Sequence, residues 1–246
     1  MASFSAYSED SLNKLQGKLK TSFASSTLYE HAAQKFAEAL YNEFSPSVVL
    51  ARVYVTIPYG QLPPFNKTFV SNLGKAKGVS NLIKDTTPIL SLVGTAGKNP
   101  EWWDRRKSQG HVGIPLCSAG FIDAIPMMSR MLQELGLNLA WFDKQDLSIA
   151  KKTMTGLSGL FYVANASQGT DAKGRKIIAA QDFVTSHKIQ TVFGMGTIYI
   201  GGFFAVCIVF TDKTITREQL QPLTTLIADF KSGTVKLANP FTWLKA

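Results

Sequence analysis

The sequence predicts an α+β fold in which an antiparallel sheet is flanked by helices. Helical patterns occupy both ends of the 246-residue chain, and segments rich in β-branched residues lie between them. Two such segments near the C-terminus, 189–199 and 203–211, are joined by a short glycine-bearing turn, which is typical of an antiparallel hairpin. With 45% hydrophobic residues, the chain has enough apolar side chains to bury a substantial core.

Two helices are predicted before the first strand. The first 24 residues form a modest helix because three leucines share one of its faces: Leu12, Leu15 and Leu19. A stronger helix covers 26–44, where apolar residues recur at helical spacing and Ser26 or Thr27 is available as the N-cap. Pro46 ends this helix, because the residue before a proline disfavours the helical conformation.

The segment 47–57 is rich in β-branched residues and predicts a strand. Alternation places Leu50, Arg52 and Tyr54 on one face and apolar residues on the other. An arginine on a strand face needs either solvent or an acidic partner, so Arg52 is a residue of interest.

Helices and strands alternate through the middle of the chain. The predicted helices cover 68–84, 118–136 and 177–188, and the predicted strands cover 87–95, 112–116 and 157–166. Pro126 either kinks the second of these helices or opens its main segment. The methionine stripe on that helix, Met127, Met128 and Met131, is a candidate ligand wall, although core packing is the more common role of such a stripe.

The segment 216–237 predicts an amphipathic helix directly after the hairpin. Thr216 and Gln219 have the spacing of a capping box, which marks the start of the helix. Tyr199, beside the glycine turn of the hairpin, is expected on the surface of the sheet.

The charge of the chain is basic, but its distribution argues against nucleic acid or a membrane as partner. The 26 basic and 17 acidic residues give a net charge of +9 and a pI near 9.5. The densest basic cluster, 98–107, has a net charge of only +2, and no nucleic-acid-binding motif occurs. The N-terminus lacks the apolar stretch of a secretory signal, so we expect a cytoplasmic location, with Cys117 and Cys207 as buried thiols.

Catalytic and metal-binding signatures are scarce. The glycine-rich segment 194–199 lacks the third glycine of a dinucleotide-binding turn. His31, His111 and His187 show no metal-ligand spacing with each other or with the cysteines. We therefore predict no catalytic residue and no metal site, and the sequence leaves the cofactor unknown.

The segment WWDRRKSQGH at 102–111 is the strongest candidate for a ligand site. Its arginines and histidine suit an anionic group, and a tryptophan supplies a flat wall. The competing interpretation is a surface loop whose tryptophans are anchors and whose charges stay solvated. Together with the arginine of the first strand, the candidate ligand-binding residues are Trp102, Trp103, Arg105, Arg106, His111 and Arg52.

The segment 187–230 resembles the closing part of a GAF domain. The matching positions are Gly202, Phe203, Ile208, Phe210, Thr216, Glu218 and Leu220. The resemblance implies a GAF/PAS-like sheet with a small-molecule pocket, a sensory role and dimerisation through the terminal helices. On this basis residues 1–25 are an N-terminal helical extension, and 26–246 form a single GAF-like domain with an enlarged middle region, an insertion at about 58–140.

The leading hypothesis is a non-catalytic, small-molecule-binding sensory module of a bacterial-type signal transduction system. It acts as a homodimer and passes its state to a separate or downstream output domain. The alternative from the enzyme class is a thiol-dependent reductase on a GAF-like scaffold, which needs Cys117 or His111 as its catalytic group. A basic adaptor for nucleic acid or a membrane surface is the third class.

Overall fold

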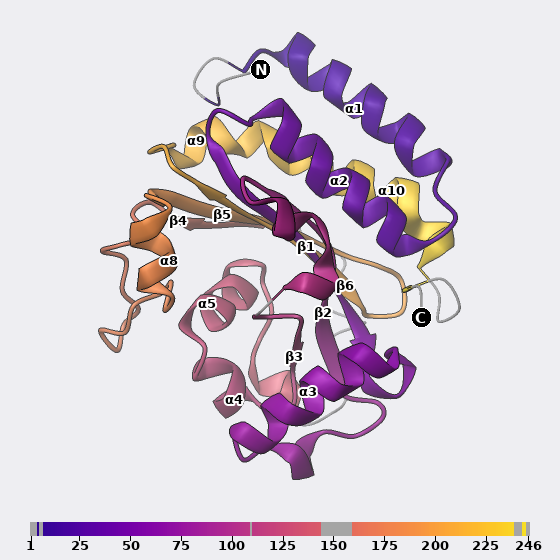
Figure 1. Cartoon of the computed structure of the whole chain (residues 1–246), viewed down its shortest axis with the longest axis vertical. Coiled ribbons are helices and arrows are strands. Elements are labelled where there is room, and N and C mark those ends of the chain that lie inside the picture. The colour runs from indigo at the N-terminus through magenta and orange to yellow at the C-terminus, as the bar shows by residue number, and fades with distance from the viewer. Residues whose placement is uncertain (1–3, 5–6, 109, 144–158, 239–242, 245–246) are drawn as a thin grey trace.

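The computed structural model of the chain is organised around one central antiparallel sheet (Figure 1). The structure describes residues 4, 7–108, 110–143, 159–238 and 243–244. In the view of Figure 1, α1, α2 and α10 lie above the sheet, whereas α3, α4 and α5 lie below it.

Six strands form the sheet in the order β3-β2-β1-β6-β5-β4, and every neighbouring pair is antiparallel. The strands are β1 (Val48–Pro58), β2 (Pro88–Gly97), β3 (Gly113–Pro115), β4 (Leu160–Val163), β5 (Thr191–Ile198) and β6 (Phe204–Thr211). The predicted α+β class and the C-terminal hairpin are therefore confirmed. Positions 157–158 of the predicted fourth strand lie outside the described residues.

The helices follow the apolar patterns of the sequence, with shorter bounds. They are α1 (Glu9–Ala24), α2 (Tyr29–Glu43), α3 (Pro64–Ala76), α4 (Ala119–Asp123), α5 (Pro126–Glu134), α6 (Ala140–Asp143), α8 (Gln181–Ser186), α9 (Arg217–Leu220) and α10 (Thr224–Thr234). Pro126 opens α5, which resolves the alternative left by the sequence. Thr216 and Gln219 form the predicted capping box at the start of α9.

The start of α2 differs from the expectation. Neither Ser26 nor Thr27 caps the helix, because its N-cap position is Leu28, whose side chain offers no acceptor. The backbone N–H of Glu30 instead donates to the carbonyl of Trp243 at 3.1 Å. A distant part of the chain thus satisfies a helix end for which the sequence suggested a local cap.

The hairpin turn buries a residue that was expected at the surface. Gly201 and Gly202 adopt φ values of 109° and 85°, which favour glycine, and they reverse the chain between β5 and β6. The reversal packs Tyr199 inward, where it is 2% exposed and its ring stacks on Phe203. The prediction that Tyr199 lies on the sheet surface was therefore wrong, because the turn extends the apolar face beyond the last paired residue.

The sheet separates two apolar cores. The first, which we call the helix-side core, includes buried residues of α1, α2 and α10 together with Val53 and Val55 of β1. The second, the cavity-side core, includes Leu50 and Tyr54 of the same strand together with residues of β6, α5 and α8. The predicted alternation along β1 is confirmed from Leu50 onward, since Leu50, Arg52 and Tyr54 share one face and Ala51, Val53 and Val55 the other. Val49, predicted on the face opposite Leu50, instead lies in the cavity-side core, because the pairing with β6 is irregular between Val48 and Leu50.

The two regions that the sequence set apart from the rest of the chain both contact the sheet layer. In the predicted N-terminal extension, of which positions 1–3 and 5–6 lie outside the described residues, α1 packs on α2 and α10. The region 58–140, predicted as an insertion, supplies strands β2 and β3 as well as α3, α4 and α5. The boundaries of this insertion stay a prediction.

Candidate functional site

A cavity of about 590 Å³ lies on the cavity-side face of the sheet. Its floor consists of side chains from the two central strands, Leu50, Tyr54, Ile208 and Phe210. Trp102, Met127, Ile178 and Phe183 also line it, so most of the lining is apolar. The size lies within the range of about 300–1,000 Å³ that is usual for small-molecule sites.

Arg52 brings a positive charge into this apolar cavity. Its Nη1 donates hydrogen bonds to the Tyr54 hydroxyl at 3.3 Å and to the Gly110 carbonyl at 3.1 Å, and its Nη2 donates to Ser108 Oγ at 2.8 Å. The sequence suggested that this arginine needs either solvent or a carboxylate. The structure supplies three neutral acceptors instead, and among the described residues no carboxylate forms an ion pair with it.

Two of the three acceptors, Gly110 and Ser108, come from the connection between β2 and β3, which turns sharply at His111. This residue adopts a φ of 56°, a conformation that is uncommon outside glycine. Desolvation lowers the pKa of His111 below its ordinary value of 6.5, and the nearby charge of Arg52 lowers it further. The imidazole is therefore neutral at pH 7, and it lines the cavity together with Arg52.

Adjacent tryptophans in the same connection point to different environments. Trp102, in the turn η4 (Pro100–Trp103), lines the cavity, and its ring packs against Phe183 at 5.8 Å and His187 at 4.9 Å between centroids. Gly97 makes this possible, since a Cβ there would overlap the Trp102 ring.

Trp103 lies outside the cavity. Its Nε1 donates to the Gly97 carbonyl at 2.8 Å, and its ring packs edge-on against Tyr41 of α2 at 5.5 Å. One tryptophan of the pair therefore faces the sheet cavity and the other faces the helix layer.

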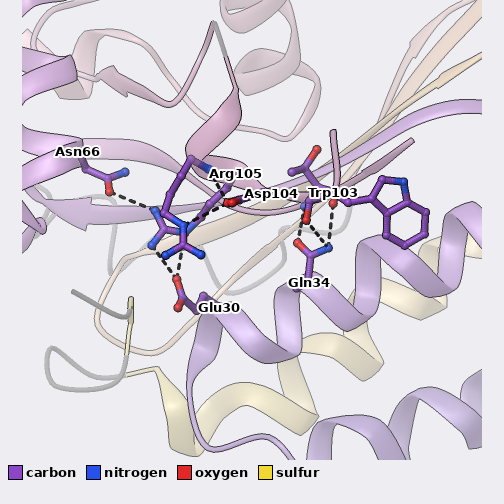
Figure 2. Close-up of polar contacts among 8 residues, drawn as sticks. Glu30, Gln34, Asn66, Trp103, Asp104 and Arg105 are labelled. Carbon is purple, nitrogen blue, oxygen red and sulfur yellow. Dashed lines mark hydrogen bonds and ion pairs between the residues drawn. The ribbon is translucent and has the colours of Figure 1, made fainter. Parts of the chain in front are cut away.

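Arg105 forms an ion pair with α2 (Figure 2). In the turn η5 (Arg105–Lys107), its Nη2 lies 2.8 Å from Oε2 of Glu30, and its Nε donates to the same oxygen at 2.9 Å. Nη1 donates to Oδ1 of Asn66 in α3 at 3.2 Å. The side chains of Arg105 and Glu30 are only 10% and 13% exposed, so this pair is largely desolvated.

Gln34 of α2 makes hydrogen bonds to the backbone of β2. Its Nε2 donates to the Thr95 carbonyl at 2.9 Å, and its Oε1 accepts from the Thr95 N–H at 3.0 Å, as a neighbouring strand would do (Figure 2). Residues 89–92 of β2 have their partners in and beside β3, so Thr95 lies past the end of that ladder. The side-chain amide therefore satisfies a strand edge that β3 does not reach.

The structure divides the six predicted site residues between two places. Arg52, Trp102 and His111 line the cavity of about 590 Å³. A separate hollow of about 410 Å³ beside α2 is lined by the other three, Trp103, Arg105 and Arg106. Arg106 itself is exposed and pairs with Asp104 at 3.1 Å.

Several cavity residues were not among the candidates. Lys107 belongs to the segment 102–111 singled out by the sequence and Glu101 directly precedes it, but Ile208, Phe210 and Phe183 looked like ordinary core residues. Met127 lines the cavity, whereas Met128 and Met131 are buried, so the methionine stripe serves both of its alternative roles. The alternation along β1 was the one signal that placed Arg52 on the same face as Leu50 and Tyr54.

The two cysteines are buried and unpaired. Burial raises the pKa of the Cys207 thiol far above its ordinary value and also raises the pKa of Cys117. Cys117 adjoins a hollow of only about 20 Å³, room for about one water molecule. Neither thiol lines the large cavity.

The architecture is similar to solved structures at very low sequence identity. One is the phycoerythrobilin-bound GAF domain from a cyanobacterial phytochrome, with 7% identity, a TM-score of 0.50 and coverage of 92% of this chain and 95% of that one. The fold is GAF-like. A second GAF-like neighbour is free methionine-R-sulfoxide reductase from Neisseria meningitidis in complex with its substrate, with 10% identity, a TM-score of 0.50 and coverage of 95% and 94%.

These similarities concern the fold alone. No protein-family model matches the sequence, and no curated protein sequence matches it. In the part of the chain that the structure describes, no helix has the length and apolar character needed to span a membrane. Within the same residues no group of three or more His, Cys, Asp or Glu side chains is arranged to hold a metal ion.

Proposed function

We propose that this GAF-like protein is a non-catalytic sensory module that binds a small molecule in the cavity beneath Trp102. The supporting observation is the cavity of about 590 Å³, which lies over the central strands and has an apolar lining with a few polar groups. The hydrogen bonds to Ser108 and Gly110 hold Arg52 at a defined position in this lining, and the positive φ of His111 directs the backbone there.

The segment between β2 and β3 provides a physical route from the cavity to the helix layer. Trp102 and Arg52 contact the cavity side, whereas Arg105 is paired with Glu30 of α2. A ligand that displaces this segment changes its contacts with α2, and such differential contacts are what a sensory response requires. We propose that α2, with α1 and α10 packed on it, receives the signal.

The buried thiols support the non-catalytic proposal over the reductase alternative. A nucleophilic cysteine needs access and a lowered pKa, and Cys117 and Cys207 have neither. His111 lines the cavity, but the raised thiol pKa values leave it without an activated nucleophile among the described cysteines.

We further propose a homodimer formed through the terminal helices, with a separate or downstream output partner. The position of α1 as the outermost helix on its side of the sheet supports this arrangement (Figure 1). The apolar side of α1 is already packed internally, so a dimer contact would use its polar side.

Unpaired cysteines are typical of a reducing compartment and support a cytoplasmic location.

Native mass spectrometry of the purified protein, together with two matched variants, tests the proposal. We expect a bound small molecule in the wild type, its loss in Trp102→Ala, and its retention in Trp103→Ala. The two variants remove the same side chain from neighbouring positions, but only the first faces the cavity. The same spectra report the number of subunits.

Amide hydrogen exchange tests the sensory part of the proposal. Addition of the co-purified ligand to stripped protein should change protection in α2 as well as around the cavity. Equal ligand retention in both tryptophan variants contradicts the binding site. Ligand binding with no change in α2 contradicts the signalling route but not the site.

A further inference from the structure

Arg52 is the one arginine that lines the cavity. Neutral acceptors hold its guanidinium in place, and no described carboxylate forms an ion pair with it. The side chain is only partly exposed, and its Nε is buried without a hydrogen-bond partner. A buried donor that lacks an acceptor costs free energy, so a native protein usually satisfies it with another protein group, water or a ligand.

The hydrogen bonds show which N–H groups of the guanidinium lack an acceptor among the described residues. An arginine carries five N–H groups, one on Nε and two on each Nη. Both N–H groups of Nη1 and one of Nη2 have neutral acceptors on Tyr54, Gly110 and Ser108. The Nε–H and the second N–H of Nη2 are left, and two such neighbouring donors match two oxygens of one oxyanion.

The charge balance around this edge is also positive. Among the described residues, Arg52 and Lys107 line the cavity against a single carboxylate, Glu101, and His111 is neutral at pH 7. Arg105, by contrast, is already paired with Glu30 outside the cavity. Arg105 therefore has a structural role, whereas Arg52 lacks a counter-ion among the described residues.

The rest of the lining defines the body of the molecule. Trp102, Phe183 and Phe210 supply aromatic surfaces, and Leu50 and Ile208 supply aliphatic ones. The volume is far larger than an inorganic anion needs, so the charged group is only one part of the ligand.

We propose, on the basis of the function proposed above, that the ligand is an organic oxyanion. A carboxylate or phosphate monoester accepts hydrogen bonds from the Nε–Nη2 edge of Arg52, and an apolar, ring-bearing body packs against the cavity side of the Trp102 and Phe183 rings. Lys107 contributes weaker, solvent-screened attraction because it is exposed.

Matched probe pairs test this inference by isothermal titration calorimetry. The carboxylates are benzoate, phenylacetate and indole acetate, the neutral partners are the corresponding amides, and phenyl phosphate is compared with phenol. We expect the anions to bind roughly tenfold or more tightly than the neutral partners, since a hydrogen bond to a charged group is worth about that factor. A preference for carboxylates or for phenyl phosphate identifies which oxyanion the cavity takes.

Arg52→Gln should remove the preference for anions, and Arg52→Lys should keep only part of it because lysine has no planar fork. Arg106→Gln is the matched control: it removes the same charge from an exposed residue outside the cavity. In case Arg52→Gln does not fold, NMR of the labelled wild type follows the Nε–H resonance of Arg52, which should shift on addition of the anions and not of the amides.

Three results overturn the inference. They are equal binding of anions and neutral partners, absence of anion binding, and an anion preference that survives in a folded Arg52→Gln protein. The proposed function is judged separately, because a co-purified neutral molecule in the cavity would leave it intact while excluding an oxyanion.

Discussion

The two faces of the sheet use the same strands for different purposes. On the helix-side face, the hydroxyl groups of Tyr29, Tyr199 and Thr234 form a buried chain with distances of 3.0 and 2.7 Å. Thr234 in turn donates to the Phe230 carbonyl at 2.6 Å. On the cavity-side face, the partly buried Arg52 keeps an Nε without a partner beside a cavity of about 590 Å³.

This difference shows where stability and binding are located. A face filled by close packing stabilises the fold, whereas a face with a cavity leaves room for a ligand. The segment between β2 and β3 contacts both faces, through Trp102 on one side and Arg105 on the other. Substitutions should therefore separate into those that unfold the protein and those that alter its ligand binding.

The largest effect is expected for Phe230→Ala. Its ring is fully buried and stacks on Phe36 at 5.0 Å, so its removal leaves a cavity and should lower the free energy of unfolding by about 3–5 kcal/mol. Phe183→Ala, on the half-buried cavity side, should cost less stability but weaken ligand binding. Urea denaturation measures the free energy of unfolding of both variants. Equal losses of this free energy would remove the distinction between the faces.

Glu30→Gln should lower the free energy of unfolding by about 2 kcal/mol, because it leaves the desolvated Arg105 without its counter-charge. The comparison is Asp104→Asn, which breaks the exposed pair with Arg106 and should cost about 0–1 kcal/mol. Thermal denaturation distinguishes these values. If ligand binding still alters hydrogen exchange in α2 of the Glu30→Gln protein, the ion pair is not the route of coupling.

Tyr199→Phe removes the central hydroxyl of the buried chain. Tyr29 then loses its partner, so we expect a loss of about 1–2 kcal/mol. On the other face, Tyr54→Phe removes only a long acceptor of Arg52, which keeps Ser108 and Gly110, and should cost about 0.5 kcal/mol or less. Chemical denaturation of both proteins makes the comparison, and a larger effect at Tyr54 would reverse it.

The smallest effect concerns pH. Burial and Arg52 lower the pKa of His111 in the folded state, so the unfolded chain takes up this proton first as the pH falls. The contribution of His111 to stability is therefore present above about pH 6.5 and is lost below it. His111→Gln should flatten the decline in unfolding free energy between about pH 7 and pH 5, and an unchanged slope would show that His111 titrates normally.

Much of the secondary structure was predictable because local patterns express it. Leu12, Leu15 and Leu19 pack as the helix period indicated, and the capping box at Thr216 lies where its spacing placed it. The errors at the start of α2 and at Tyr199 arose because residues distant in the sequence make the contacts there. The backbone of Trp243 satisfies the start of α2, and Thr234 provides the partner that buries Tyr199.

The candidate site was predictable only as a segment. Charge and aromatic content identified 102–111, but composition does not reveal on which side of a turn each side chain emerges. Neighbouring residues diverged as a result: Trp102 lines the cavity, whereas Trp103 and Arg105 lie beside α2.

The sequence by itself determined the α+β class, the hairpin, the main helices and the face of β1 that carries Arg52. Each of these depends on periodicity or turn chemistry within a few residues. The tertiary structure alone decided that Arg52 has only neutral acceptors and that Arg105 is matched by Glu30. Both outcomes depend on groups distant in the chain: Ser108 and Gly110 lie 56 and 58 positions from Arg52, and Glu30 lies 75 positions from Arg105. Local sequence does not show which distant groups meet in the fold.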